Sequence, residues 1–220
     1  MKTVLIGCKT LENELCAAIQ RTDWAGETVW IESGLHNVPQ RLHDVLQEKI
    51  DVCQDFDRIL LGMGFCGNAL ADIRTGSAEI ILPRADDCIS LLCGSAQKRA
   101  MYHRTYFFTD GWLRGERTIW NEYEHSLKKY GECCTKQIFH DMLCHYEDCA
   151  LLETGCFETE PAEREVRRIA GVLGLSYRSI PGTIDYLCDL LTGPWPETRF
   201  LTCRPNSIIE RASLLLPEFS

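Results

Sequence analysis

The sequence predicts an α/β fold in which a parallel sheet carries helices on both faces. Short apolar runs alternate with amphipathic stretches along most of the 220 residues. The apolar positions of the amphipathic stretches follow the helical period, and the connections are short. This alternation is typical of parallel sheets, because each crossover helix brings the chain back so that the next strand runs in the same direction.

The first half of the chain shows the alternation most clearly. Apolar residues at positions 11, 15, 18 and 19 mark one face of a helix. Pro39 suits the first turn of another helix, and two aspartates, at 86 and 87, suit the positive N-terminus of a third. We therefore expect strands at 3–7, 27–34, 56–62, 78–83 and 104–112, and helices at 10–22, 38–51, 67–76 and 86–95.

The second half begins with a polar helical region, 116–149, after which the α/β alternation resumes. We expect strands at 149–155, 175–182 and 199–205, and helices at 161–175 and 183–193. The architecture is therefore predicted to be doubly wound and Rossmann-like, with two similar lobes. The first lobe, 1–115, carries the Cys and Gly motifs, and the second, 116–220, packs on it.

Composition excludes several classes of protein. The net charge of −9 and the lack of a basic stripe argue against a nucleic-acid binder. No run of about 18 apolar residues is present, so we expect no membrane span. The N-terminal stretch ends in charged residues without a cleavage site, so it does not read as a signal peptide, and we expect the cytosol.

Thirteen cysteines are the main anomaly of composition. The odd count in a chain expected in the cytosol argues against a disulfide framework. We expect about eight or nine of them to be buried as small hydrophobic residues. The positions of the others decide which could act as ligands.

Several cysteines follow the predicted strands directly. These are Cys8, Cys66, Cys88, Cys156 and Cys203, and His36 follows the second strand. In an open α/β sheet the ligand crevice lies beyond the carboxyl ends of the strands, so such groups can converge. Thiolates and imidazole favour an iron–sulfur cluster, zinc or another transition metal. The alternative is that they are core cysteines at crowded strand ends.

A glycine motif surrounds Cys66. Gly62, Gly64 and Gly67 match G-x-G-x-x-G, the dinucleotide fingerprint when it joins a strand to a helix. Cofactor contacts would then come from these glycines together with Asn68, Arg84 and Asp87. Arg84 could hold a phosphate or carboxylate, or pair with a neighbouring aspartate. However, the motif follows the third strand rather than the first, and the predicted helix after it is short.

Two weaker candidates lie elsewhere. The segment "CHYEDC" (144–149) offers ligand-type side chains at mixed spacing, and Asp110 and Trp112 close the predicted fifth strand. No nucleophile elbow, P-loop or H-E-x-x-H motif is present in the sequence.

The run from 61 to 112, with "LGMGFCGNAL", "ILPRADDCISLLCGS" and "TYFFTDGW", resembles family 1638 among the domains of unknown function. The early Gly7–Cys8 pair and the stretch "GLHNVPQRL" (34–42) also fit, so the resemblance spans roughly 1–205. It implies that Cys8, Cys66 and Cys88 belong to the family motifs. It implies that Cys156 and Cys203 do not belong to them and that Cys93 has a core role.

The resemblance also implies a setting. Members of the family occur in anaerobic bacteria and methanogenic archaea, where genes for corrinoid-dependent methyl transfer lie nearby. This implies a role near methylamine or betaine demethylation, as an enzyme or as an accessory factor. A corrinoid protein or its methyltransferase would then be the partner.

Three hypotheses follow. In the first, Cys8, Cys66 and Cys88 hold an iron–sulfur cluster with one open iron, or close a tetrahedral zinc site together with His36. In the second, the loop 62–67 binds a nucleotide or S-adenosylmethionine. In the third, the protein is a non-catalytic partner of a methyltransferase system.

Overall fold

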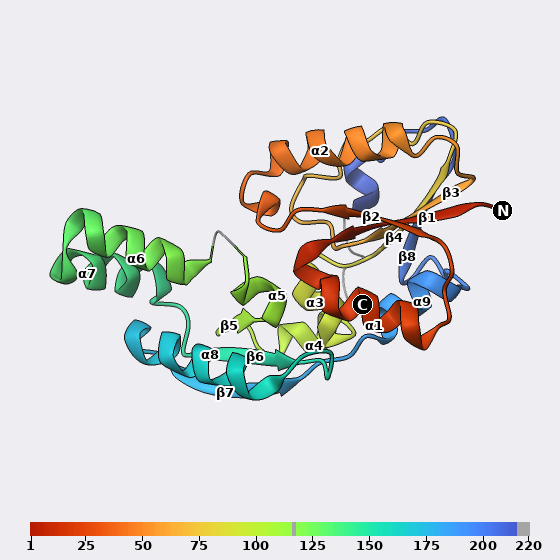
Figure 1. Cartoon of the computed structure of the whole chain (residues 1–220). Helices are drawn as coiled ribbons and strands as arrows, with labels where there is room; N and C mark the ends of the chain where they lie inside the picture. Colours follow the sequence, from red (N-terminus) through yellow and green to blue (C-terminus); the bar gives the residue numbers. More distant parts are fainter. Residues whose placement is uncertain (116–117, 215–220) are drawn as a thin grey trace.

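The computed structural model describes residues 1–115 and 118–214, and it contains two sheets (Figure 1). The first has the order β2-β1-β3-β4-β8, and the second has the order β5-β6-β7. The strands of the first are β1 (Thr3–Cys8), β2 (Glu27–Ile31), β3 (Arg58–Gly62), β4 (Glu79–Pro83) and β8 (Phe200–Cys203). Those of the second are β5 (Thr105–Phe108), β6 (Asp148–Glu153) and β7 (Ser176–Pro181). All pairs are parallel except β4 with β8, so the predicted α/β class with a parallel sheet is confirmed.

The helices lie between and outside the sheets. They are α1 (Glu12–Arg21), α2 (Pro39–Val52), α3 (Cys88–Cys93), α4 (Ala96–Ala100), α5 (Asp110–Leu113), α6 (Ile119–Tyr130), α7 (Glu132–Leu143), α8 (Thr159–Leu173) and α9 (Asp185–Thr192). Short 3-10 turns cover η1 (Lys9–Leu11), η2 (Leu35–Asn37) and η3 (Arg211–Leu214). Within the described residues, no helix is long and apolar enough to cross a membrane.

Side chains of β1 point alternately to the two faces of the first sheet, and each face is covered by helices. Val4 and Ile6 pack with Leu46 of α2 on one face of the first sheet. Leu5 points to the other face, where it joins Leu15 of α1. Because both faces are covered, the strand is a continuous apolar run, as expected for a parallel strand.

The second sheet shares the middle layer. Leu152 of β6 belongs to the same core as α1, α3 and α9, so this core lies between the two sheets. Its neighbour Leu151 points outward and packs with Val166 and Ile169 of α8. In Figure 1 the α6–α7 hairpin extends away from these layers at one end.

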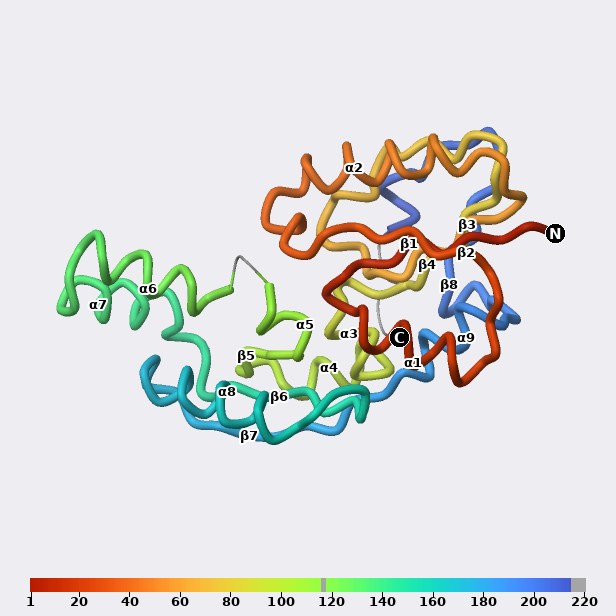
Figure 2. Tube along the Cα trace, viewed as in Figure 1, coloured from red at the N-terminus to blue at the C-terminus, as the bar shows by residue number. Residues whose placement is uncertain are grey.

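The two sheets do not divide the chain at the predicted boundary between 115 and 116. Strand β5 precedes that boundary but pairs with β6, and β8 follows it but pairs with β4. The tube in Figure 2 follows the chain from β7 through α9 back to the first sheet. The second sheet is therefore nested between β4 and β8 of the first.

Two local predictions were wrong. The segment 67–76 contains turns instead of a helix, because Gly67 and Asp72 adopt left-handed backbone angles and Thr75 donates its N–H to the Ser207 carbonyl. The predicted strand 104–112 ends at Phe108, and Thr109 caps the short helix α5 by accepting the Trp112 N–H.

Candidate functional site

The order β2-β1-β3-β4 places the topological switch point between β1 and β3. A ligand crevice is expected beyond the carboxyl ends of these two strands. Cys8 is the last residue of β1, Cys66 lies in the loop after β3, and Cys88 opens α3 after β4. The three cysteines that the family resemblance selects therefore lie at the same edge of the first sheet.

These thiols act on one another electrostatically. Burial, together with the negative charges of Cys8 and Asp87, raises the pKa of Cys66 to about 12. Burial also raises the pKa of Cys88 well above its usual value, and the charges of Cys66, Asp87 and Cys8 add to this. The structure thus brings Cys8, Cys66 and Cys88 together, with Asp87 as a fourth acidic neighbour.

His36 lies at the same crevice, in η2 after β2. Burial lowers its pKa, while the charge of Asp87 acts in the opposite direction. Burial therefore favours the neutral imidazole, which is the form that binds metals. Among the described residues no three Cys, His, Asp or Glu side chains stand in the arrangement of ligands around one ion, so the thiols are neighbours without being a preassembled ligand set.

The backbone of the β3 loop is unusual at Cys66. Its φ of 48° lies in the left-handed region, which costs a residue other than glycine about 1–2 kcal/mol. Backbone strain of this kind clusters at functional sites. The conformation turns the chain sharply after Phe65 and leaves Cys66 partly exposed at the crevice.

Gly64 is required by close packing of two loops. A Cβ at this position would lie 2.6 Å from the carbonyl carbon of Asp87. Gly62 has a different role, since a Cβ there would meet the side chain of Leu15 at 3.0 Å. Gly67 has a φ of 72° with open space around it. The three glycines therefore serve a tight turn and its packing.

The loop amides are engaged within the protein. The N–H of Phe65 donates to the Ala85 carbonyl at 2.7 Å, and the N–H of Cys66 donates to the Asp86 carbonyl at 2.8 Å. A phosphate cradle needs free N–H groups at a helix N-terminus, and no helix follows Gly67. This geometry favours a turn that presents a thiol over a turn that holds a pyrophosphate.

The other residues assigned to a nucleotide have structural partners. The guanidinium of Arg84 donates to the carbonyls of Glu197 at 2.7 Å and Ser213 at 3.0 Å, so it ties the C-terminal segment to β4. The carboxylate of Asp87 accepts the N–H and hydroxyl of Ser90 and caps α3. Asn68 is exposed beside the turn.

The remaining cysteines do not join the cluster. Cys203 pairs with Ile80 at the amino end of β4, because β8 runs antiparallel, so its predicted place at the crevice edge was wrong. Cys156 follows β6 in the second sheet, and Cys93 is buried, as expected for a core residue. The cysteines are all unpaired, but only five are buried, fewer than we predicted, since four on helix surfaces and turns are exposed.

Sequence reasoning missed Glu14 of α1. This side chain is fully buried, its Oε1 accepts the Thr154 hydroxyl at 2.9 Å, and its Oε2 has no partner among the described residues. Burial raises its pKa, and the nearby charge of Asp110 adds to the rise. The sequence did indicate its burial, because position 14 lies on the apolar helix face that contains positions 11 and 18.

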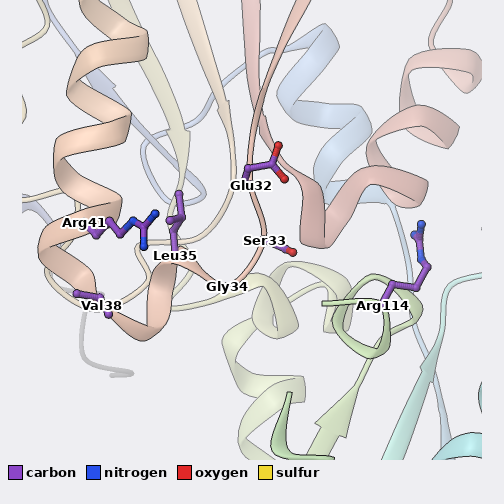
Figure 3. A pocket seen from close by; sticks show the side chains of 7 residues that line it. All are labelled: Glu32, Ser33, Gly34, Leu35, Val38, Arg41 and Arg114. Carbon is purple, nitrogen blue, oxygen red and sulfur yellow. The ribbon is translucent and has the colours of Figure 1, made fainter. Parts of the chain in front are cut away.

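A cleft of about 470 Å³ borders the crevice. In Figure 3, Glu32, Ser33 and Gly34 lie on the segment after β2, and Arg114, which follows α5, lies apart from them on the other side of the view. Ser33 and Gly34 also line a smaller cavity that reaches His36. Glu32 pairs with Lys9 at 2.6 Å, so this side of the cleft is polar.

Comparison with known proteins gives one relationship. No curated protein and no solved structure matches the chain. A family model described as a protein of unknown function, DUF1638, matches residues 30–191. The matched segment includes His36, Cys66 and Cys88, whereas Cys8 precedes it. Because the match covers well over half of the chain, the protein belongs to the DUF1638 family.

Proposed function

We propose that the protein binds a transition-metal ion or an iron–sulfur cluster through Cys8, Cys66 and Cys88, with His36 as fourth ligand or neighbour. The observation that carries the proposal is that Cys8, Cys66 and Cys88 follow the carboxyl ends of three neighbouring parallel strands, β1, β3 and β4. Every charged group that acts on Cys66 or Cys88 is acidic, and each raises the thiol pKa. Among the described residues, the charged groups that act on these two thiols are therefore themselves acidic.

This environment distinguishes a ligand set from a catalytic thiol. A nucleophilic or redox-active cysteine needs a lowered pKa, supplied by a basic neighbour or a helix N-terminus. Here the pKa values of Cys66 and Cys88 move the other way. A bound metal cation would lower these thiol pKa values, because it favours the deprotonated thiolate ligand and compensates its charge.

The chemistry of these donors suits two kinds of metal group, and binding either would require the side chains to move into a ligand arrangement that the described residues do not show. Three thiolates around a [4Fe–4S] cluster leave one iron open, which supplies redox or Lewis-acid chemistry. Three thiolates and the neutral imidazole of His36 close a tetrahedral zinc site with a structural role. In either case the left-handed turn at Cys66 would place its thiol at the crevice.

The proposed cellular role rests on the family resemblance alone. That resemblance implies a setting in anaerobic bacteria and methanogenic archaea, beside genes for corrinoid-dependent methyl transfer. We place the protein in cytosolic one-carbon metabolism of methylamines or betaine, as an enzyme or as an accessory factor. Its partner would be a corrinoid protein or a methyltransferase.

The test is anaerobic purification followed by analysis of metal and acid-labile sulfide. We expect stoichiometric metal in the natural protein and its loss in Cys66→Ala. Cys133→Ala is the matched control, because Cys133 is exposed on α7, far from this sheet edge. Colourless protein without metal, or equal metal content in both variants, would refute the proposal.

Nucleotide or S-adenosylmethionine binding at 62–67 is the second candidate. One observation favours it: nothing lies within 4 Å of the position a Gly67 Cβ would take, so there is room beside the turn. It predicts saturable binding of radiolabelled S-adenosylmethionine or ATP that survives Cys66→Ser. A non-catalytic partner role predicts instead that the protein co-purifies with a methyltransferase and has no turnover alone.

A further inference from the structure

An aromatic groove lies between the α6–α7 hairpin and β5, outside the thiol crevice. Its volume is about 550 Å³, which is in the range of small-molecule sites. Tyr106 of β5, Trp112 of α5, Phe139 of α7 and Tyr146 line it. The groove therefore collects rings from four separate segments of the chain.

The rings are arranged edge to face. The Tyr106 and Trp112 centroids are 5.8 Å apart with an interplanar angle of 79°, and those of Tyr106 and Tyr146 are 5.4 Å apart at 76°. In each edge-on pair the edge of one ring covers one face of the other, and the Phe108 centroid lies 5.2 Å from that of Tyr106 and 5.3 Å from that of Trp112. Tyr106, Trp112 and Tyr146 are all partly exposed. The exposed part of an aromatic face carries the negative lobe of the ring quadrupole and attracts cations.

The groove also carries a negative charge, which would attract a cationic ligand. Glu122 of α6 lines it and is exposed, and none of the described lining residues is Lys or Arg. A neutral apolar ligand would cover this carboxylate without pairing it, which is unfavourable. A bare metal ion would find one carboxylate among aromatic and aliphatic walls, too few oxygen ligands for a hard cation.

We propose that this aromatic groove binds a small organic cation of the quaternary ammonium type, held by the faces of Tyr106, Trp112 and Tyr146 and by the Glu122 carboxylate. The proposal uses none of the thiols, so it stands or falls separately from the metal site. Trp112 also lines the small cavity at His36. The groove therefore shares one lining residue with the small cavity at His36.

The test uses choline chloride as the probe, with calorimetry and saturation-transfer NMR at low ionic strength. The comparator is 3,3-dimethylbutan-1-ol, which has the same shape without the charge. We expect saturable choline binding and weaker binding of the alcohol. Equal binding of the two would show a plain apolar pocket, and no saturable choline binding would show that the site is absent; either result overturns the proposal.

Two variants assign the binding to the groove. Trp112→Leu removes an aromatic face but keeps apolar bulk, and we expect choline affinity to fall about tenfold. Glu122→Gln, at an exposed position that folding tolerates, should reduce it about threefold. Glu124→Gln is the matched control, since it removes the same charge from the same helix outside the groove. A similar loss in Glu124→Gln, or none in Glu122→Gln and Trp112→Leu, contradicts the proposal.

Discussion

Cys66 donates its backbone N–H to the carbonyl of Asp86 at 2.8 Å, and this bond ties the loop after β3 to the loop after β4. The same contact sets Cys66 beside Cys88 at the crevice. The position of the thiols is thus fixed by main-chain pairing between two loops. The following predictions test this arrangement and the buried charges around it.

Gly64→Ala should separate the two loops. Its Cβ would meet the Asp87 backbone at 2.6 Å, so we expect a loss of about 1–3 kcal/mol in the free energy of unfolding. Gly171→Ala is the control, because a Cβ in that part of α8 meets nothing within 4 Å, and it should stabilise the protein by about 0.5–1 kcal/mol. Urea denaturation measures both, and equal effects would show that the loops do not pack as described.

Asp87→Asn should make the clustered thiols more reactive in metal-free protein. The Asp87 charge raises the pKa of Cys66 and Cys88, and asparagine keeps the cap of α3 while removing the charge. Alkylation by iodoacetamide at pH 8, followed site by site by mass spectrometry, should be slow at Cys66 and severalfold faster in the variant. Unchanged rates at both thiols would place Asp87 too far from them.

Protonation of Cys66 also predicts a dependence of stability on pH. Its pKa rises from 9.0 to about 12 on folding, so the folded protein holds this proton more tightly. The contribution is complete below pH 9 and is lost as pH rises toward 12. In metal-free protein, Cys66→Ala should flatten the decline in stability over this window, and an unaltered decline would contradict the burial of the thiol.

Glu14→Gln tests the buried carboxyl between the sheets. Burial raises the Glu14 pKa above 4.5, so its contribution to stability is present below pH 4.5 and is lost as pH rises through the folded pKa. Glutamine keeps an acceptor for Thr154 but cannot ionise. We expect the variant to gain on the order of 1 kcal/mol relative to the natural protein between pH 4.5 and 7.

The control for Glu14→Gln is Glu12→Gln, at a partly exposed position on the same helix. It should change stability by less than about 0.5 kcal/mol at either pH. Thermal unfolding at the two pH values compares the variants. A Glu14→Gln difference that is independent of pH would mean that folding does not raise the pKa of this carboxyl.

The strands were predictable because each one is a short apolar run between turn residues. "TVLIG" and "RILLG" became β1 and β3 almost without adjustment. Their parallel pairing then determined where Cys8 and Cys66 lie. The site was therefore predictable to the extent that topology, rather than side-chain packing, positions it.

The sequence pattern of a strand did not reveal which sheet it joins or which strand it pairs with. The run that became β8 looks like any other short strand, and only its antiparallel pairing with β4 moved Cys203 to the far edge. Non-local pairing also replaced the expected helix at 67–76, whose backbone bonds to residues near 207–209. In both cases contacts distant in sequence outweighed local propensity.

The nesting of β5–β7 between β4 and β8 has a consequence for how the fold can be divided. A fragment that ends at residue 115 would carry β5 without its partner β6 and would expose the edge of β4 that β8 covers. Exposed edges of this kind invite aggregation. The topology is that of an insertion rather than a tandem duplication, so the two sheets should melt in one cooperative transition.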